Sequence, residues 1–143
     1  MSRILAIDYG TKRVGIAVTD PLQMIATPLA SVHAREAVSF VIEYTKKEET
    51  ECVVIGKPVQ MDNTASESEK QIKVFIQTLR KQKPDLKIER YDERFTSVMA
   101  QQTLHTMGES KRMRKDKSVI DRTSAVIILQ SYLLYRNNKI KHT

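Results

Sequence analysis

Three acidic residues lie at positions where this sequence can support metal-dependent chemistry. Asp8 ends one apolar segment, Glu93 follows another, and Asp121 falls in the first turn of a predicted helix. Carboxylates about 4 Å apart repel by about 4 kcal/mol per pair at an effective dielectric constant of 20, so a fold that collects three needs a cation. Oxygen-only ligands, without Cys or His, indicate Mg²⁺ or Mn²⁺. Two such ions ~4 Å apart would hold a phosphodiester and activate a water to hydrolyse it.

Each acid also has an ordinary structural interpretation. An Asp at a strand end often accepts a turn hydrogen bond. Glu93, with Asp92 and Arg94 beside it, could belong to a surface ion pair. Asp121 fits a capping box with Ser118 and suits the positive end of a helix dipole. Taken one at a time the structural interpretations are favoured, so the functional hypothesis depends on the three acids meeting.

Hydrophobic periodicity predicts the elements that must bring the acids together. The expected strands are Arg3–Tyr9, Val14–Val18, Ile25–Val32, Glu51–Gly56 and Leu86–Tyr91, and the expected helices are Arg35–Glu49, Ser66–Gln82, Thr96–Met107 and Ser118–Tyr135. Three antiparallel strands come first, and strands separated by helices then pair in parallel through right-handed crossovers. A three-layer α/β fold with a mixed sheet of about five strands is therefore expected.

This arrangement explains how distant acids become neighbours. In open α/β sheets, functional groups gather beyond the carboxyl ends of parallel strands, which is where Asp8 and Glu93 fall. In the last helix, Asp121 starts a row that continues through Ala125 and Leu129 on the apolar side, so it is expected to face the sheet.

Positive charge is concentrated around these positions. The 143 residues include 24 Lys and Arg against 17 Asp and Glu, a net charge of +7. Lys12 and Arg13 lie in the turn just after Asp8, and the basic segment Lys111–Lys117 precedes Asp121. Such cations suit the phosphate backbone of a nucleic acid without reading its sequence. A solvated loop kept soluble by its charge is the alternative interpretation of the basic segment.

The length predicts one domain spanning residues 1–143, with residues 136–143 as a flexible basic tail. A single cysteine, Cys52, leaves no disulfide framework, and the three histidines lack zinc-site spacing. No apolar run approaches the ~20 residues of a membrane span, and the first residues do not form a signal peptide. These features favour a reducing, cytoplasmic location without membrane contact.

Four motifs occur in the order and spacing of a known family. They are Ile7–Ala17, Val54–Pro58, Asp92–Thr96 and Val119–Gln130. In these motifs, and from Ile4 to about Tyr135 along the chain, the sequence resembles the YqgF/RuvX family. The resemblance implies an RNase H-like fold and a metal-binding catalytic trio of Asp8, Glu93 and Asp121. Members of that family were first described as Holliday junction resolvases, and later as nucleases that mature the 5′ end of small-subunit ribosomal RNA.

The leading hypothesis is a metal-dependent endonuclease that acts on structured RNA, namely pre-16S ribosomal RNA, with two Mg²⁺ or Mn²⁺ ions. Asp8 would bridge both ions, while Glu93 and Asp121 would each complete one site. The candidate substrate-binding residues are Lys12, Arg13, Arg94, Lys115 and Lys117.

Two alternatives remain open at this point. A resolvase of branched DNA would be a two-fold dimer, because it needs two active sites facing opposite strands. A non-catalytic RNA-binding factor of ribosomal precursor particles would use the basic surface and no metal. The sequence does not choose between a monomer and a homodimer.

Overall fold

The computed structural model describes the backbone of residues 2–57, 67–92 and 117–141, and their side chains except those of 67, 68, 117–123 and 138–141. The strands are β1 (Arg3–Tyr9), β2 (Arg13–Thr19), β3 (Ala26–His33), β4 (Thr50–Lys57) and β5 (Lys87–Asp92). The helices are the 3₁₀ turn η1 (Ala34–Glu36), α1 (Ala37–Lys47), α2 (Glu67–Gln82) and α5 (Lys117–Lys141). The expected helix Thr96–Met107 lies outside the described residues.

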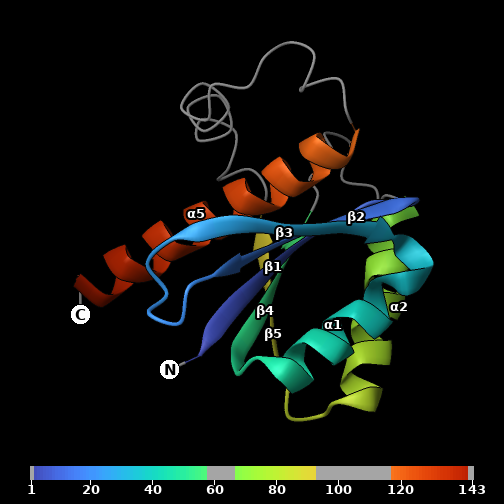
Figure 1. The fold of residues 1–143 in the computed structure, drawn as a ribbon, viewed down its shortest axis with the longest axis horizontal. Helices are drawn as coiled ribbons and strands as arrows, with labels where there is room; N and C mark the ends of the chain where they lie inside the picture. Colours follow the sequence, from blue (N-terminus) through green and yellow to red (C-terminus); the bar gives the residue numbers. More distant parts are fainter. Residues whose placement is uncertain (1, 58–66, 93–116, 142–143) are drawn as a thin grey trace.

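The five strands form one mixed sheet in the order β3-β2-β1-β4-β5 (Figure 1). β1 pairs antiparallel with β2, which pairs antiparallel with β3, whereas β4 lies parallel to both β1 and β5. The predicted α/β class and its antiparallel-then-parallel sheet are therefore confirmed. Pro28 lies in β3, an edge strand, where a residue without an amide hydrogen removes no bond from the centre of the sheet.

Apolar side chains on both faces of the sheet make the three layers. Along β1, Leu5 and Ile7 belong to the core cluster that includes residues of α1 and α2. Ile4 and Ala6 belong to the second cluster, which includes α5. Continuous apolar runs in β1 and β4 follow from this burial on both faces. Helix α5 covers one side of the sheet, and α1 and α2 cover the other (Figure 1).

The last helix extends beyond its expected end at Tyr135. It remains helical through Lys141, so it enters the segment for which a flexible tail was predicted. The Arg136 guanidinium pairs with Glu51 at 3.2 Å and donates a hydrogen bond of 2.8 Å to the Gln23 side chain. These contacts hold the helix against the start of β4 and the β2–β3 turn. None of the described helices has the length and apolar character needed to cross a membrane.

Candidate active site

Asp8 lies near the carboxyl end of β1, in the middle of the sheet. It pairs with Gly15 of β2, and because Ile7 pairs with Ile55, it lies beside Gly56 at the end of β4. Successive side chains of a strand point to opposite faces. Asp8 therefore shares a face with Ala6, the face covered by α5, and it is half-buried. A partly shielded carboxylate at the end of a central strand is in the position expected of a site residue.

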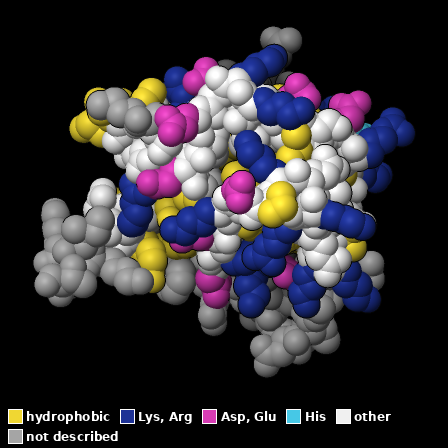
Figure 2. Space-filling model, turned by 90° about the horizontal axis from the view of Figure 1, so that it is seen from below, with side chains coloured by type: hydrophobic (Ala, Val, Ile, Leu, Met, Phe, Trp, Pro, Cys, Tyr) yellow, Lys and Arg dark blue, Asp and Glu magenta, His cyan; other side chains and the backbone are white. Residues whose placement is uncertain are grey.

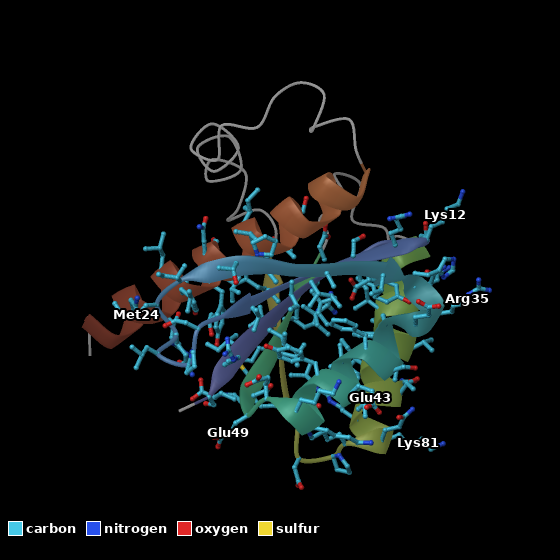
Figure 3. The ribbon with its side chains drawn as sticks, in the orientation of Figure 1. Lys12, Met24, Arg35, Glu43, Glu49 and Lys81 are labelled. Atoms are coloured by element: carbon cyan, nitrogen blue, oxygen red, sulfur yellow. The ribbon has the colours of Figure 1, made fainter. Side chains whose placement is uncertain are left out.

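The turn after Asp8 has a tight backbone geometry. The Gly10 amide donates a hydrogen bond of 2.9 Å to the Arg13 carbonyl, and a Cβ on Gly10 would lie 2.6 Å from that oxygen. The Ala34 amide donates a bond of 2.9 Å to the Lys12 carbonyl, which ties the turn to η1. Lys12 and Arg13 are exposed, and Figure 3 shows Lys12 at the same end of the molecule as Arg35. The turn that follows the Asp8 end of β1 therefore presents two cations.

An ion pair holds the neighbouring strand ends. Arg90 of β5 donates to both carboxylate oxygens of Glu69 in α2, over 2.8 and 2.9 Å. Its guanidinium also donates to the carbonyls of Ile55 and Gly56, at 3.4 and 3.2 Å. The hydrogen bond from Arg90 lowers the pKa of Glu69. Arg90 therefore connects α2 to the carboxyl ends of β4 and β5, on the face of the sheet opposite to the one that Asp8 shares with Ala6.

Sequence reasoning missed this pair. Ser66 and Glu69 have the spacing of a capping box, which is the interpretation that the sequence alone favours for Glu69, and Ser66 lies outside the described residues. A signal was present, because Glu69 precedes Ile72 by three positions and Ile76 by seven, which places it on the buried side of α2. An acid on an apolar helix face requires a buried partner.

The direction of α5 brings its first turn to the Asp8 end of the sheet. Arg136 binds Glu51 at the start of β4, so the C-terminal part of α5 lies at the amino ends of the parallel strands. Asp121 precedes Arg136 by 136 − 121 = 15 residues, about 22 Å of helix. The strand path from Glu51 to Gly56 is about 17 Å. Allowing for the tilt of a helix across a sheet, the backbone of Asp121 lies near the level of Asp8, and Figure 1 draws the first turns of α5 at that end.

The predicted site residues are described to different extents. Asp8, Lys12 and Arg13 lie together at one end of the sheet. Asp121 and Lys117 are placed by their backbone in α5, without their side chains. The other predicted residues lie outside the described part of the chain: Glu93, Arg94 and Lys115. Within that part, no three Asp, Glu, His or Cys side chains form a group able to hold a metal ion, so the trio stays a prediction.

Comparisons with known proteins agree with the motifs. The family model described as "RuvX: Holliday junction resolvase" matches residues 2–135. A protein of Bacteroides fragilis named "Putative pre-16S rRNA nuclease" is 50% identical over 133 residues, which is 93% of this chain and 96% of that protein. A protein of the same name from Christiangramia forsetii is 49% identical over 93% of this chain and 98% of its own length.

Solved structures show the same fold at low sequence identity. Thermus thermophilus RuvC in complex with a Holliday junction substrate superimposes with a TM-score of 0.58 and 16% identity, covering 96% of each chain. A second structure of Thermus thermophilus RuvC gives a TM-score of 0.54 and 13% identity, covering 94% of this chain and 96% of that one. RuvC has the RNase H-like fold, so the expected fold is confirmed.

Proposed function

The chain belongs to the RuvX family, whose members are nucleic-acid-cleaving hydrolases, and we propose on that premise that it is a metal-dependent endonuclease maturing the 5′ end of pre-16S ribosomal RNA. The observation that carries the proposal is Asp8 at the carboxyl end of the central strand, in a chain 50% identical to relatives named as pre-16S rRNA nucleases. The proposed enzyme is a single domain that acts in the cytoplasm, on free precursor RNA or on ribosomal precursor particles.

Asp8, Glu93 and Asp121 are the proposed metal ligands. Their carboxylate oxygens are the donors that Mg²⁺ and Mn²⁺ take, and Asp8 lies on the sheet face that α5 covers. When bound, such ions lower the pKa of a water nucleophile and stabilise the leaving oxygen. Asp8 contributes a negative charge on a central strand. The closely packed core around that strand fixes the position of its backbone.

Lys12 and Arg13 are the proposed phosphate contacts nearest to Asp8. Both project from a turn whose backbone is closed by the Gly10 to Arg13 hydrogen bond. The closed turn fixes the backbone positions from which the two cations project, which lowers part of the entropy cost of binding. Arg94, Lys115 and Lys117 are proposed as further contacts. Binding that depends on phosphate contacts weakens steeply as salt is raised.

Substitution of Asp8 tests the proposal. Labelled precursor RNA that spans the 5′ end of 16S is incubated with Mg²⁺, Mn²⁺ or EDTA. Wild-type protein is expected to cleave it only with metal, and Asp8→Asn to bind it nearly as well without cleaving. Asp85→Asn, in an exposed turn before β5, is the matched control because it removes the same charge outside the site. Equal cleavage by wild type and Asp8→Asn in Mn²⁺ would contradict the assignment.

Cleavage of branched DNA is the second candidate function. It is favoured by the resolvase description of the family model and by the fold shared with RuvC. A four-way DNA junction is added to the same assay, together with sedimentation to determine the oligomeric state. A dimer that cuts the junction and leaves the RNA intact supports resolution. A protein that binds RNA, cleaves neither substrate and shows no Asp8-dependent metal binding by calorimetry is instead an assembly factor.

A further inference from the structure

Tyr9 forms one wall of a groove that lies beside Asp8 on the opposite face of the sheet. Its ring packs against Phe75 of α2, with centroids 5.1 Å apart and planes tilted by 48°. The groove has a volume of about 380 Å³ and lies between η1, the start of α1, and α2. Tyr9, Val38 and Val74 contribute apolar surface to it. Its volume is in the range of sites that hold small organic groups.

Among the described residues that line this groove, the formal charges are all positive. Arg35 and Lys70 are the charged residues that line it, and the remaining lining residues are uncharged at neutral pH. Burial raises the pKa of the Tyr9 phenol, so that side chain stays neutral as well. A groove with an aromatic wall, aliphatic surface and two cations suits a flat heterocycle attached to a phosphate.

The exposed side of α2 continues the positive field away from the groove. Among its described side chains the exposed charged residues are all basic, and they are Lys70, Lys73, Arg80 and Lys81. Figure 2 views the molecule from the side of α1 and α2, where many Lys and Arg side chains lie on the surface, with hydrophobic side chains and some Asp and Glu side chains among them. A nucleic acid strand supplies a flat base and a negative phosphate in every nucleotide, whereas an acidic peptide supplies both only where an aromatic residue lies beside its acids.

We propose that this groove binds one unpaired base of the RNA substrate, within about two nucleotides of the bond held at Asp8. The inference rests on the proposed function, because it needs the scissile phosphate at Asp8. Neighbouring Cα atoms are ~3.8 Å apart, and Asp8 and Tyr9 point to opposite faces close to the strand end. An RNA strand that crosses this edge of the sheet therefore places a phosphate on one side and a base on the other.

A paired base cannot enter the groove, because both its faces are stacked and its edge is engaged with its partner. The groove would therefore favour RNA that is unpaired near the cleaved bond. The stacking is tolerant of base identity, since every base offers a flat π-surface.

Removal of single bases from the RNA provides the sharpest test. Binding is measured by fluorescence anisotropy in the Asp8→Asn background, so that the RNA stays intact, with substrates that each lack one base along the unpaired segment. We expect one position at which the missing base weakens binding about five- to tenfold. Tyr9→Leu is expected to weaken binding of the intact RNA equally, and to have no further effect on the RNA that lacks that base. Tyr9→Phe keeps the ring and is expected to retain binding.

A second pair of variants avoids the core altogether. Val74 is 61% exposed, so Val74→Glu places a negative charge in the groove without removing core packing. Gln77→Glu introduces the same charge on the exposed surface of α2 outside the groove. Val74→Glu is expected to weaken binding of the intact RNA, with little effect of Gln77→Glu. Lys70→Gln is compared in the same way with Lys81→Gln, and only Lys70→Gln is expected to weaken binding. Lys81 lies near the C-terminal end of α2, far from Lys12 in Figure 3.

Photocrosslinking locates the base directly. A 4-thiouridine at the identified position is expected to crosslink to a peptide containing Tyr9, as shown by mass spectrometry. The proposal is overturned if Tyr9→Leu and Val74→Glu bind intact RNA like the parent protein, or if they weaken the intact RNA and every abasic RNA to the same extent. If the wild type cleaves the RNA and the groove variants bind it like the parent protein, the base-binding proposal is wrong and the nuclease proposal stands. If binding depends on one base and no protein cleaves the RNA, the nuclease proposal is wrong and the base-binding proposal stands.

Discussion

Arg90 and Glu69 form a two-point ion pair between β5 and α2, with N–O distances of 2.8 and 2.9 Å. The side chains are only 26% and 11% exposed, so water and salt screen this pair less than a surface pair. Arg90 additionally donates to the carbonyls of Ile55 and Gly56. The pair therefore stabilises the carboxyl ends of β4 and β5, and β4 is the parallel neighbour of β1, the strand that carries Asp8.

Loss of this ion pair is expected to alter the acid stability of the protein. The pKa of Glu69 lies below its ordinary value of 4.5, so its charged form stabilises the fold above that value. This stability is lost as the pH falls through the lowered pKa. Glu69→Gln is expected to cost about 1–3 kcal/mol of unfolding free energy at pH 7, and the difference from wild type should shrink in acid.

Urea unfolding between pH 3 and pH 7 measures this difference. Glu43→Gln is the matched control, because Glu43 pairs with Lys46 at 3.6 Å on an exposed surface, where a pair contributes at most about 0.5 kcal/mol. A constant difference between wild type and Glu69→Gln across the pH range would show that the carboxylate charge is not what stabilises the contact.

Gly10→Ala is expected to distort the β1–β2 turn. The new Cβ would lie 2.6 Å from the Arg13 carbonyl oxygen, a backbone atom that moves only with the turn. We expect a loss of about 1–3 kcal/mol in stability, and weaker RNA binding because Lys12 and Arg13 shift with it. Thermal unfolding and anisotropy measure both effects, with Thr11→Ala in the same exposed turn as the control. Unchanged stability and binding would mean that the turn relaxes at little cost.

Cys52 is expected to be unreactive in the native protein. Its side chain is 1% exposed, and burial raises the pKa of the thiol to about 11. Because the thiolate is the reactive form, labelling by a disulfide reagent at pH 8 should be at least about 100-fold slower than in urea. Cys52 is the only cysteine of the chain, so the thiol-labelling signal comes from this residue alone. Rapid labelling of the folded protein would contradict the buried position of β4.

Stability measurements with metal test the acidic trio without relying on cleavage. If Asp8, Glu93 and Asp121 lie close together, their repulsion destabilises the metal-free protein. Asp8→Asn is then expected to raise the melting temperature without metal, and to lose the stabilisation that Mn²⁺ gives the wild type, about 2.7 kcal/mol at 100 times Kd. Asp85→Asn should respond to Mn²⁺ like the wild type. A lower melting temperature for metal-free Asp8→Asn would argue against the cluster.

Local patterns in the sequence were sufficient to predict the order of the described strands and of the helices α1, α2 and α5, and the class of sheet. The apolar runs at Ile4–Ile7 and Cys52–Ile55 indicate strands buried on both faces, and both are central strands of the sheet. The motif around Asp8 predicted a turn with two cations, because the types of a few consecutive residues are enough to determine a turn between two strands. The positions of Asp8, Lys12 and Arg13 were therefore predictable from the sequence.

Contacts between distant segments were decided by the tertiary structure. The Arg90–Glu69 pair, the groove beside Tyr9 and the anchoring of Arg136 each join parts of the chain that no local pattern relates. Periodicity tells which side of a helix or strand is buried, because that depends on the spacing of neighbours along the chain. It does not tell which buried groups meet, because that depends on the packing of one element against another in three dimensions.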